Sequence, residues 1–111
     1  MNLSPRARAL LAAQKDRYLE SLPDRRVAFE QMWKRVIKDA SNRDLLRELT
    51  RASHQLAGNA GNFGLDELGQ AARALDKRLQ VCQTEDADPV AGCQPAMNGL
   101  IGAFDKAIEA L

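Results

Sequence analysis

One side chain stands out as a candidate for chemistry, because His54 is the only histidine among 111 residues. Imidazole serves as a nucleophile, a base or a metal ligand near neutral pH. A histidine-rich zinc site is excluded, and Cys82 and Cys93 lack the CxxC spacing of a zinc knuckle. The sequence also has neither a glycine-rich phosphate loop nor a GxSxG nucleophile elbow. We therefore expect no metal site and no cofactor, and chemistry that depends on one imidazole.

The spacing of apolar residues around His54 predicts a helix that exposes it. At about 100° per residue, five apolar positions fall within ~60° of one another on one face. These positions are Leu45, Leu49, Ala52, Leu56 and Phe63. His54 falls almost diametrically opposite them, so we expect its ring to face solvent. A histidine of the core would lie within the apolar stripe instead.

The neighbours of His54 on the exposed face are small or basic. Gly58 and Gly61 follow it by one and two turns, although glycine destabilises a helix by about 0.5–1 kcal/mol relative to alanine. Small residues there let another protein approach closely. Arg51 and Arg47 precede it by one and two turns, and guanidinium groups bind phosphate well. Two simpler interpretations stay open, namely a surface histidine without function and glycines that serve tight helix packing.

The elements that must position these residues are all helices. The chain is the size of one domain, 1–111, and no β-rich segment interrupts the helical periodicity. The predicted helices begin at Ser4-Pro5, after Pro23, near Asn42 with Ser41 as a possible cap, at Leu65 after a stop at Gly64, and at Pro95 after a polar loop over 83–94. Short connections favour antiparallel neighbours. The predicted fold is therefore all-α, an antiparallel four-helix bundle with an additional N-terminal helix.

The charge balance argues against two classes of partner. Sixteen Lys and Arg against fifteen Asp and Glu leave a formal net charge of +1, without the basic excess of a protein that binds nucleic acid or a membrane surface. No apolar run approaches the ~20 residues that span a bilayer. The first fourteen residues hold no apolar stretch of signal-peptide length, so we expect a cytoplasmic protein with free thiols at Cys82 and Cys93. A solvated helix face explains the basic clusters Arg25-Arg26 and Lys34-Arg35-Lys38.

The segment from Leu49 to Leu79 resembles the histidine-containing phosphotransfer (HPt) domain family of bacterial phosphorelays. The matching motif is His54-Gln55-Leu56-Ala57-Gly58, followed by Gly61, Phe63-Gly64-Leu65 and Leu68. The resemblance implies an HPt-like bundle in which His54 accepts a phosphoryl group from a receiver-domain aspartate or a hybrid histidine kinase and passes it to a response regulator. It also implies a monomer without autokinase activity, whose partner receiver supplies the Mg²⁺ ion and the catalytic carboxylates.

One position departs from the family pattern. The residue three after the histidine is usually a lysine that helps to neutralise the phosphoryl group, and here it is Ala57. We predict that Arg51, Arg73 or Lys77 supplies this charge instead. Family members often place a polar partner for the imidazole at the position of Asp76, so we also predict that Asp76 orients the ring.

The surface around the histidine is the predicted docking site for the partner. It comprises Arg47, Thr50, Gln55, Ala57, Gly58 and Gly61. In the phosphoacceptor domain of histidine kinases, a neighbouring class, an acidic residue usually follows the histidine and a proline comes soon after. Here Gln55 follows, and no proline lies between Pro23 and Pro89. The alternative that stays open is a helical adaptor that docks a response regulator without carrying phosphate, which Ala57 favours.

Overall fold

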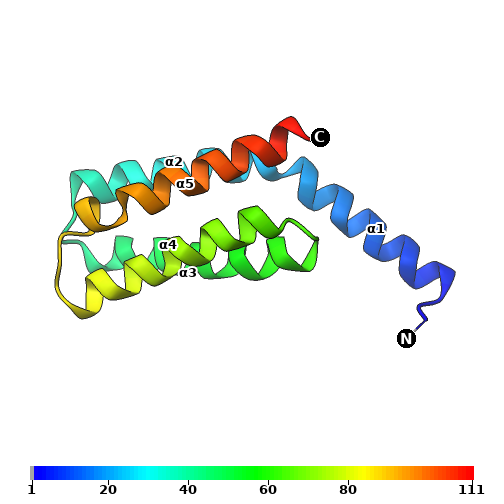
Figure 1. Cartoon of the computed structure of the whole chain (residues 1–111), viewed down its shortest axis with the longest axis horizontal. Helices are drawn as coiled ribbons and strands as arrows, with labels where there is room; N and C mark the ends of the chain where they lie inside the picture. The colour runs from blue at the N-terminus through cyan, green and yellow to red at the C-terminus, as the bar shows by residue number, and fades with distance from the viewer. Residues whose placement is uncertain (1) are drawn as a thin grey trace.

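The computed structural model describes residues 2–111, which fold into five α-helices joined by short loops (Figure 1). The helices are α1 (Pro5–Glu20), α2 (Leu22–Lys38), α3 (Arg43–Asn62), α4 (Asp66–Thr84) and α5 (Pro89–Glu109). No strand occurs in the described range. The predicted class is confirmed: the chain is all-α, with a four-helix bundle of α2 to α5 and α1 as the additional N-terminal helix.

Helices α2 to α5 form the bundle in two layers. α3 packs along α4 in one layer and α2 along α5 in the other, while α4 and α5 join the layers through a second extensive contact (Figure 1). The side chains between the layers are almost completely buried, among them Leu22, Leu49, Leu68, Leu75, Leu79, Met97, Leu100 and Phe104. Burial of each such side chain contributes about 1.5–3 kcal/mol. The core therefore provides a firm base for groups on the surface of α3 and α4.

Helix α1 begins as predicted and then lies apart from the bundle. The Ser4 hydroxyl accepts a hydrogen bond from a first-turn N–H at 3.1 Å, and Pro5 opens the helix. Figure 1 shows α1 projecting from the end of the bundle where the C-terminus lies. Its one buried residue is Tyr18, whose ring centroid lies 4.9 Å from that of Phe63. The bundle core is therefore built almost without α1.

The predicted start of the last helix is wrong. α5 begins at Pro89 rather than Pro95, because the Asp88 carboxylate accepts from the Val90 N–H at 3.0 Å and caps the helix earlier. Pro95 lies inside α5, where it removes a backbone hydrogen bond without ending the helix. The polar loop shrinks accordingly to residues 85–88.

Helix α3, which carries His54, has a defined start and end. Asn42 rather than Ser41 caps it, since the Asn42 Oδ1 accepts from the N–H groups of Asp44 and Leu45 at 3.0 and 3.3 Å. After the other end, Gly64 takes a φ of 76°, a left-handed conformation that glycine adopts readily. The predicted stop at Gly64 is thus confirmed. His54 lies in the middle of this 20-residue helix, away from its ends.

The two thiols are free and buried where α4 meets α5. The Sγ atoms of Cys82 and Cys93 are 3.8 Å apart. Burial, together with the neighbouring thiol of Cys82, raises the pKa of Cys93 to about 12. Because the thiolate is the nucleophilic form, this raised pKa lowers the reactivity of Cys93 at neutral pH.

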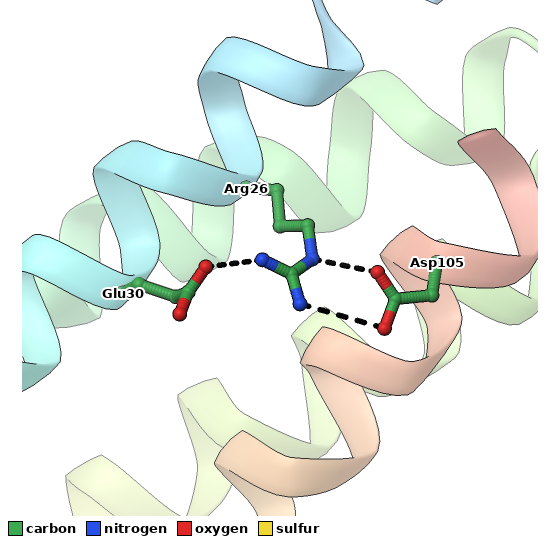
Figure 2. Close-up of polar contacts among 3 residues, drawn as sticks. All are labelled: Arg26, Glu30 and Asp105. Atoms are coloured by element: carbon green, nitrogen blue, oxygen red, sulfur yellow. Dashed lines mark hydrogen bonds and ion pairs between the residues drawn. The ribbon is translucent and has the colours of Figure 1, made fainter.

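Polar groups in the layer of α2 and α5 bond to one another. Figure 2 shows Arg26 of α2 between two carboxylates: it donates to Asp105 of α5 through Nε at 2.6 Å and Nη2 at 3.5 Å, and it pairs with Glu30 one turn along α2. The buried Trp33 of α2 donates its indole N–H to Gln94 of α5 at 3.3 Å. These polar contacts join α2 to α5 within the chain.

Candidate functional site

His54 is exposed as predicted, with 79 % of its side chain accessible, but α3 buries a different face from the predicted one. The buried residues of α3 are Leu46, Leu49, Ser53, Leu56, Ala57 and Ala60. This face is centred about 60° around the helix from the predicted stripe, so His54 lies roughly 110° from it rather than opposite. The shift arises because α3 packs chiefly against α4, through small side chains that a count of large apolar residues overlooks.

The imidazole of His54 contacts a buried carboxylate on the neighbouring helix. Its Nδ1 lies 3.0 Å from Oδ2 of Asp76, a residue that is only 6 % exposed. An ionised carboxylate only accepts hydrogen bonds, so this contact favours the tautomer in which Nδ1 carries the proton and donates it. The free lone pair of the neutral ring is then on Nε2, the nitrogen away from Asp76. The structure therefore brings Asp76 to the ring, and its role in orienting the imidazole stays a prediction.

Two glutamines of α4, which lie outside the predicted site residues, extend this polar contact. Gln80 Nε2 donates to Oδ1 of Asp76 at 2.8 Å, and Gln83 Nε2 donates to Thr50 Oγ1 across the two helices at 3.0 Å. Asp76, Gln80 and Gln83 recur at i, i+4 and i+7, so they form one polar stripe beside the apolar stripe of α4. That spacing is the signal in the sequence that identifies them.

An open groove of about 560 Å³ runs beside His54 along α3 and α4. Its lining residues are Arg47, Thr50, Arg51, His54, Gln55, Asp76, Gln80, Gln83 and Thr84. Five predicted site residues therefore share the groove with the histidine, namely Arg47, Thr50, Arg51, Gln55 and Asp76. The predicted residues outside the groove are the two glycines, Ala57 and two cations of α4. Those two cations, Arg73 and Lys77, are exposed but do not line it.

Arg51 is one of two arginines that line the groove. Within residues 2–111 it forms no ion pair, whereas a guanidinium nitrogen of Arg47 lies 3.5 Å from a carboxylate oxygen of Asp44. Arg51 also lies one helical turn from His54. Its charge is therefore available to an anion in the groove.

Gly58 and Gly61 leave open space on the surface of α3. A methyl group built at either position meets no atom within 4 Å. The tight helix contact involves Gly69 of α4 instead, whose added Cβ would lie 3.4 Å from both the Ala57 carbonyl oxygen and the Gly61 nitrogen. Helix packing therefore does not explain the absence of a side chain at Gly58 or Gly61.

Ala57 does not belong to the exposed face. It is 7 % exposed and is part of the hydrophobic core. The prediction that its side chain contributes to docking is wrong, because the buried face of α3 is rotated toward α4 and includes this position. At Ala57 the lysine of the family pattern is thus replaced by a core residue.

An antiparallel helical bundle that displays one histidine on its surface is the arrangement of the histidine phosphotransfer class. The sequence model of the Hpt domain matches residues 15–111, and the chain belongs to this family. The predicted family is thereby confirmed. No curated protein and no solved structure matches the chain. Hpt domains are phosphocarriers of phosphorelays, in which they interact with receiver domains.

Two further findings describe residues 2–111. None of their helices combines the length and the apolar character needed to cross a membrane. These residues also contain no group of three or more His, Cys, Asp or Glu side chains placed to hold a metal ion.

Proposed function

We propose that this protein is a phosphocarrier with His54 as its phospho-acceptor. It takes a phosphoryl group from a receiver-domain aspartate or a hybrid histidine kinase and passes it to a response regulator. The observation that carries the proposal is an exposed imidazole whose Nδ1 lies 3.0 Å from the buried carboxylate of Asp76. Membership of the Hpt family supports the reaction class.

Transfer begins when the Nε2 lone pair of His54 attacks the phosphorus atom of an aspartyl phosphate. The N–P bond forms while the bond from phosphorus to the aspartate oxygen breaks, and the aspartate leaves as a carboxylate. The ring keeps its Nδ1 proton and gains positive charge, which the Asp76 carboxylate stabilises from 3.0 Å. Onward transfer reverses these steps, with the next receiver's aspartate as the nucleophile. Asp76 therefore fixes the tautomer before attack and stabilises the charge after it.

Arg51 takes the role of the lysine that the family places three residues after the histidine. It lines the groove one turn from His54 and forms no ion pair within residues 2–111. A guanidinium group binds phosphate oxygens through two parallel N–H donors. Arg73 and Lys77 are secondary candidates for this role, because they are exposed on α4 outside the groove.

The partner receiver docks over the exposed groups that surround His54. These are Arg47, Gln55, Gly58 and Gly61, together with the half-buried Thr50. The open space above both glycines supports a close approach of the receiver's backbone. The receiver supplies the Mg²⁺ ion and the catalytic carboxylates, so the carrier contributes positioning and electrostatics. The carrier itself acts as a cytoplasmic monomer, with no cofactor, no autokinase activity and no contact with nucleic acid or membranes.

Phosphotransfer with purified protein tests the proposal. Wild type and His54→Gln are incubated with a panel of phosphorylated receivers and kinases that carry labelled phosphate. We expect acid-labile, base-stable label on the wild type and none on the variant, with equal helix content by circular dichroism. Label that persists on the His54→Gln variant would place the acceptor elsewhere and overturn the assignment.

A second candidate function is a helical adaptor that docks a response regulator without carrying phosphate. The observation that favours it is Ala57, a core residue where the family places a cation. Measurable binding to a receiver, together with the absence of label from every donor, would support the adaptor and contradict the carrier.

A further inference from the structure

The carboxylate that contacts His54 has a second partner on its own helix. Oδ2 of Asp76 lies 3.0 Å from the imidazole Nδ1, and Oδ1 accepts a hydrogen bond from Gln80 Nε2 at 2.8 Å. Gln80 stands one turn after Asp76 on α4, where an i, i+4 pair meets on the same face of a helix. The two bonds together engage both oxygens of a nearly buried carboxylate.

Docking of a partner does not explain the two hydrogen bonds of Asp76, because this carboxylate is nearly buried. Asp76 is 6 % exposed, whereas the side chain of His54 is 79 % exposed and therefore loosely held by packing. A carboxylate bonded only to such a ring is free to rotate about its last torsion, because that torsion has a broad energy well. A bond to the second oxygen removes this freedom and presents Oδ2 toward Nδ1.

We propose that Gln80 is a positioning residue of the carrier site: its amide fixes the Asp76 carboxylate and so holds His54 as the Nδ1–H tautomer with Nε2 free to attack. The role in phosphotransfer rests on the proposed function, but the effect on the tautomer does not. A neutral amide suits this task, because it orients the carboxylate without cancelling the negative charge that stabilises the phosphorylated ring.

Gln83 provides a matched control on the same helix. Its Nε2 donates to Thr50 Oγ1 at 3.0 Å and to the Leu79 carbonyl oxygen at 2.9 Å, and it makes no hydrogen bond to Asp76. Both glutamines line the groove beside His54. The variants Gln80→Met and Gln83→Met remove the same amide from the same groove, but only the first removes a bond to the carboxylate.

The experiment reads the His54 tautomer by long-range ¹H–¹⁵N correlation at about pH 9, where an imidazole is neutral. Since His54 is the only histidine, its ring signals need no assignment. We expect a mainly Nδ1–H ring in the wild type and in Gln83→Met, and a clear shift toward the Nε2–H form in Gln80→Met. Gln80→Glu keeps the shape but cannot donate when ionised, so it should shift the tautomer in the same direction.

Phosphorylation by phosphoramidate, a small donor that needs no docking, gives the second readout. We expect Gln80→Met to slow labelling of His54 by roughly three- to tenfold, which corresponds to the typical net contribution of one hydrogen bond. An unchanged tautomer in both Gln80 variants would overturn the proposal, whatever happens to transfer. A tautomer shift in a protein that no receiver can label would instead support Gln80 as a positioning residue while contradicting the proposed function.

Discussion

The two layers of the bundle carry grooves of comparable size but different chemistry. The α3–α4 groove, about 560 Å³, contains His54 with its orienting carboxylate and a guanidinium that forms no ion pair within residues 2–111. The α2–α5 groove, about 410 Å³, is lined by Trp33 and Met97, and the charges of Arg26 and Asp105 nearby are paired with each other. Volume therefore does not distinguish the candidate site. An unpaired cation does not distinguish it either, since Lys34 of the α2–α5 groove also forms no ion pair within residues 2–111. The imidazole with its orienting carboxylate does.

Open glycines occur in both layers, so they do not mark a docking surface by themselves. Gly99 and Gly102 of α5 resemble Gly58 and Gly61 of α3, because an added methyl group meets no atom within 4 Å at any of the four. Only the α3 pair flanks the histidine. The α5 pair therefore supplies controls in which a glycine is replaced by the same residue far from His54.

Among changes in the two layers, removal of the Asp76 carboxylate should reduce the rate of phosphotransfer most strongly. Asp76→Ala frees the imidazole and removes the charge that stabilises the phosphorylated ring, so transfer from a phosphorylated receiver should slow by roughly 100-fold. The matched change in the other layer, Asp105→Ala, removes the acceptor of Arg26 and should leave transfer unchanged. Initial rates of label transfer measure both. Equal losses in the two variants would show that the effect comes from the fold rather than the site.

Bulk over the glycine beside the histidine should have the next largest effect. Gly58→Leu fills the space that the receiver enters, and transfer from a receiver should fall by roughly tenfold or more, since small misplacements of reacting groups are costly. Phosphoramidate labelling should stay near the wild-type rate. Gly102→Leu, with a similar gain in helix propensity of about 0.5–1 kcal/mol, should affect neither rate. A receiver that tolerates Gly58→Leu would remove the glycines from the docking surface.

Loss of the groove cation should have a smaller effect that depends on salt. Arg51→Ala should slow transfer by roughly three- to tenfold at low ionic strength, and the difference from wild type should narrow as salt screens the exposed charge. Arg47→Ala, which removes a guanidinium already near Asp44, should slow transfer less. Rates of phosphotransfer measured across a series of salt concentrations show which of the two arginines contributes more. If Arg47→Ala proves the slower variant, the phosphoryl group lies nearer the other end of the groove.

The smallest effect on transfer is expected where α4 meets α5, at the seam between the two layers. A Cβ at Gly92 would lie 2.6 Å from the Cys82 Sγ, so Gly92→Ala should destabilise the fold by roughly 1–3 kcal/mol. Transfer at a temperature where the variant stays folded should match wild type. Gly99→Ala on the same helix meets no such contact and should not destabilise. Urea denaturation measures both free energies of unfolding, and equal stability of the two variants would contradict the prediction.

The fold followed from the sequence more completely than the site did. Caps and apolar periods predicted the number and order of helices, but prolines misplaced two starts. α2 begins at Leu22 rather than after Pro23, because the first turn of a helix accommodates proline. α5 begins at Pro89 rather than Pro95, because only Asp88 supplies a cap. The buried face of α3 was misjudged because Ser53, Ala57 and Ala60 are too small to register as a stripe.

The polar groups next to the histidine were likewise predicted only in part. The family resemblance predicted the contact with Asp76, whereas Gln80 required knowledge of which side chains of α4 face α3. The position of a single helix can be inferred from its own periodicity. The register between two helices depends on how closely they approach. At Gly69 the approach of α4 to α3 is limited by the backbone atoms of α3, and a pattern of side chains does not predict such contacts.

The buried indole of Trp33 and the exposed imidazole of His54 give this molecule two separate spectroscopic reporters. Trp33 is the only tryptophan and belongs to the α2–α5 layer, while His54 is the only histidine and belongs to the α3–α4 layer. Tryptophan fluorescence thus follows unfolding of the α2–α5 layer, and the imidazole resonances follow events at the α3–α4 groove. A single sample of any variant can therefore reveal whether a substitution has altered folding or has acted at the histidine, without an added label.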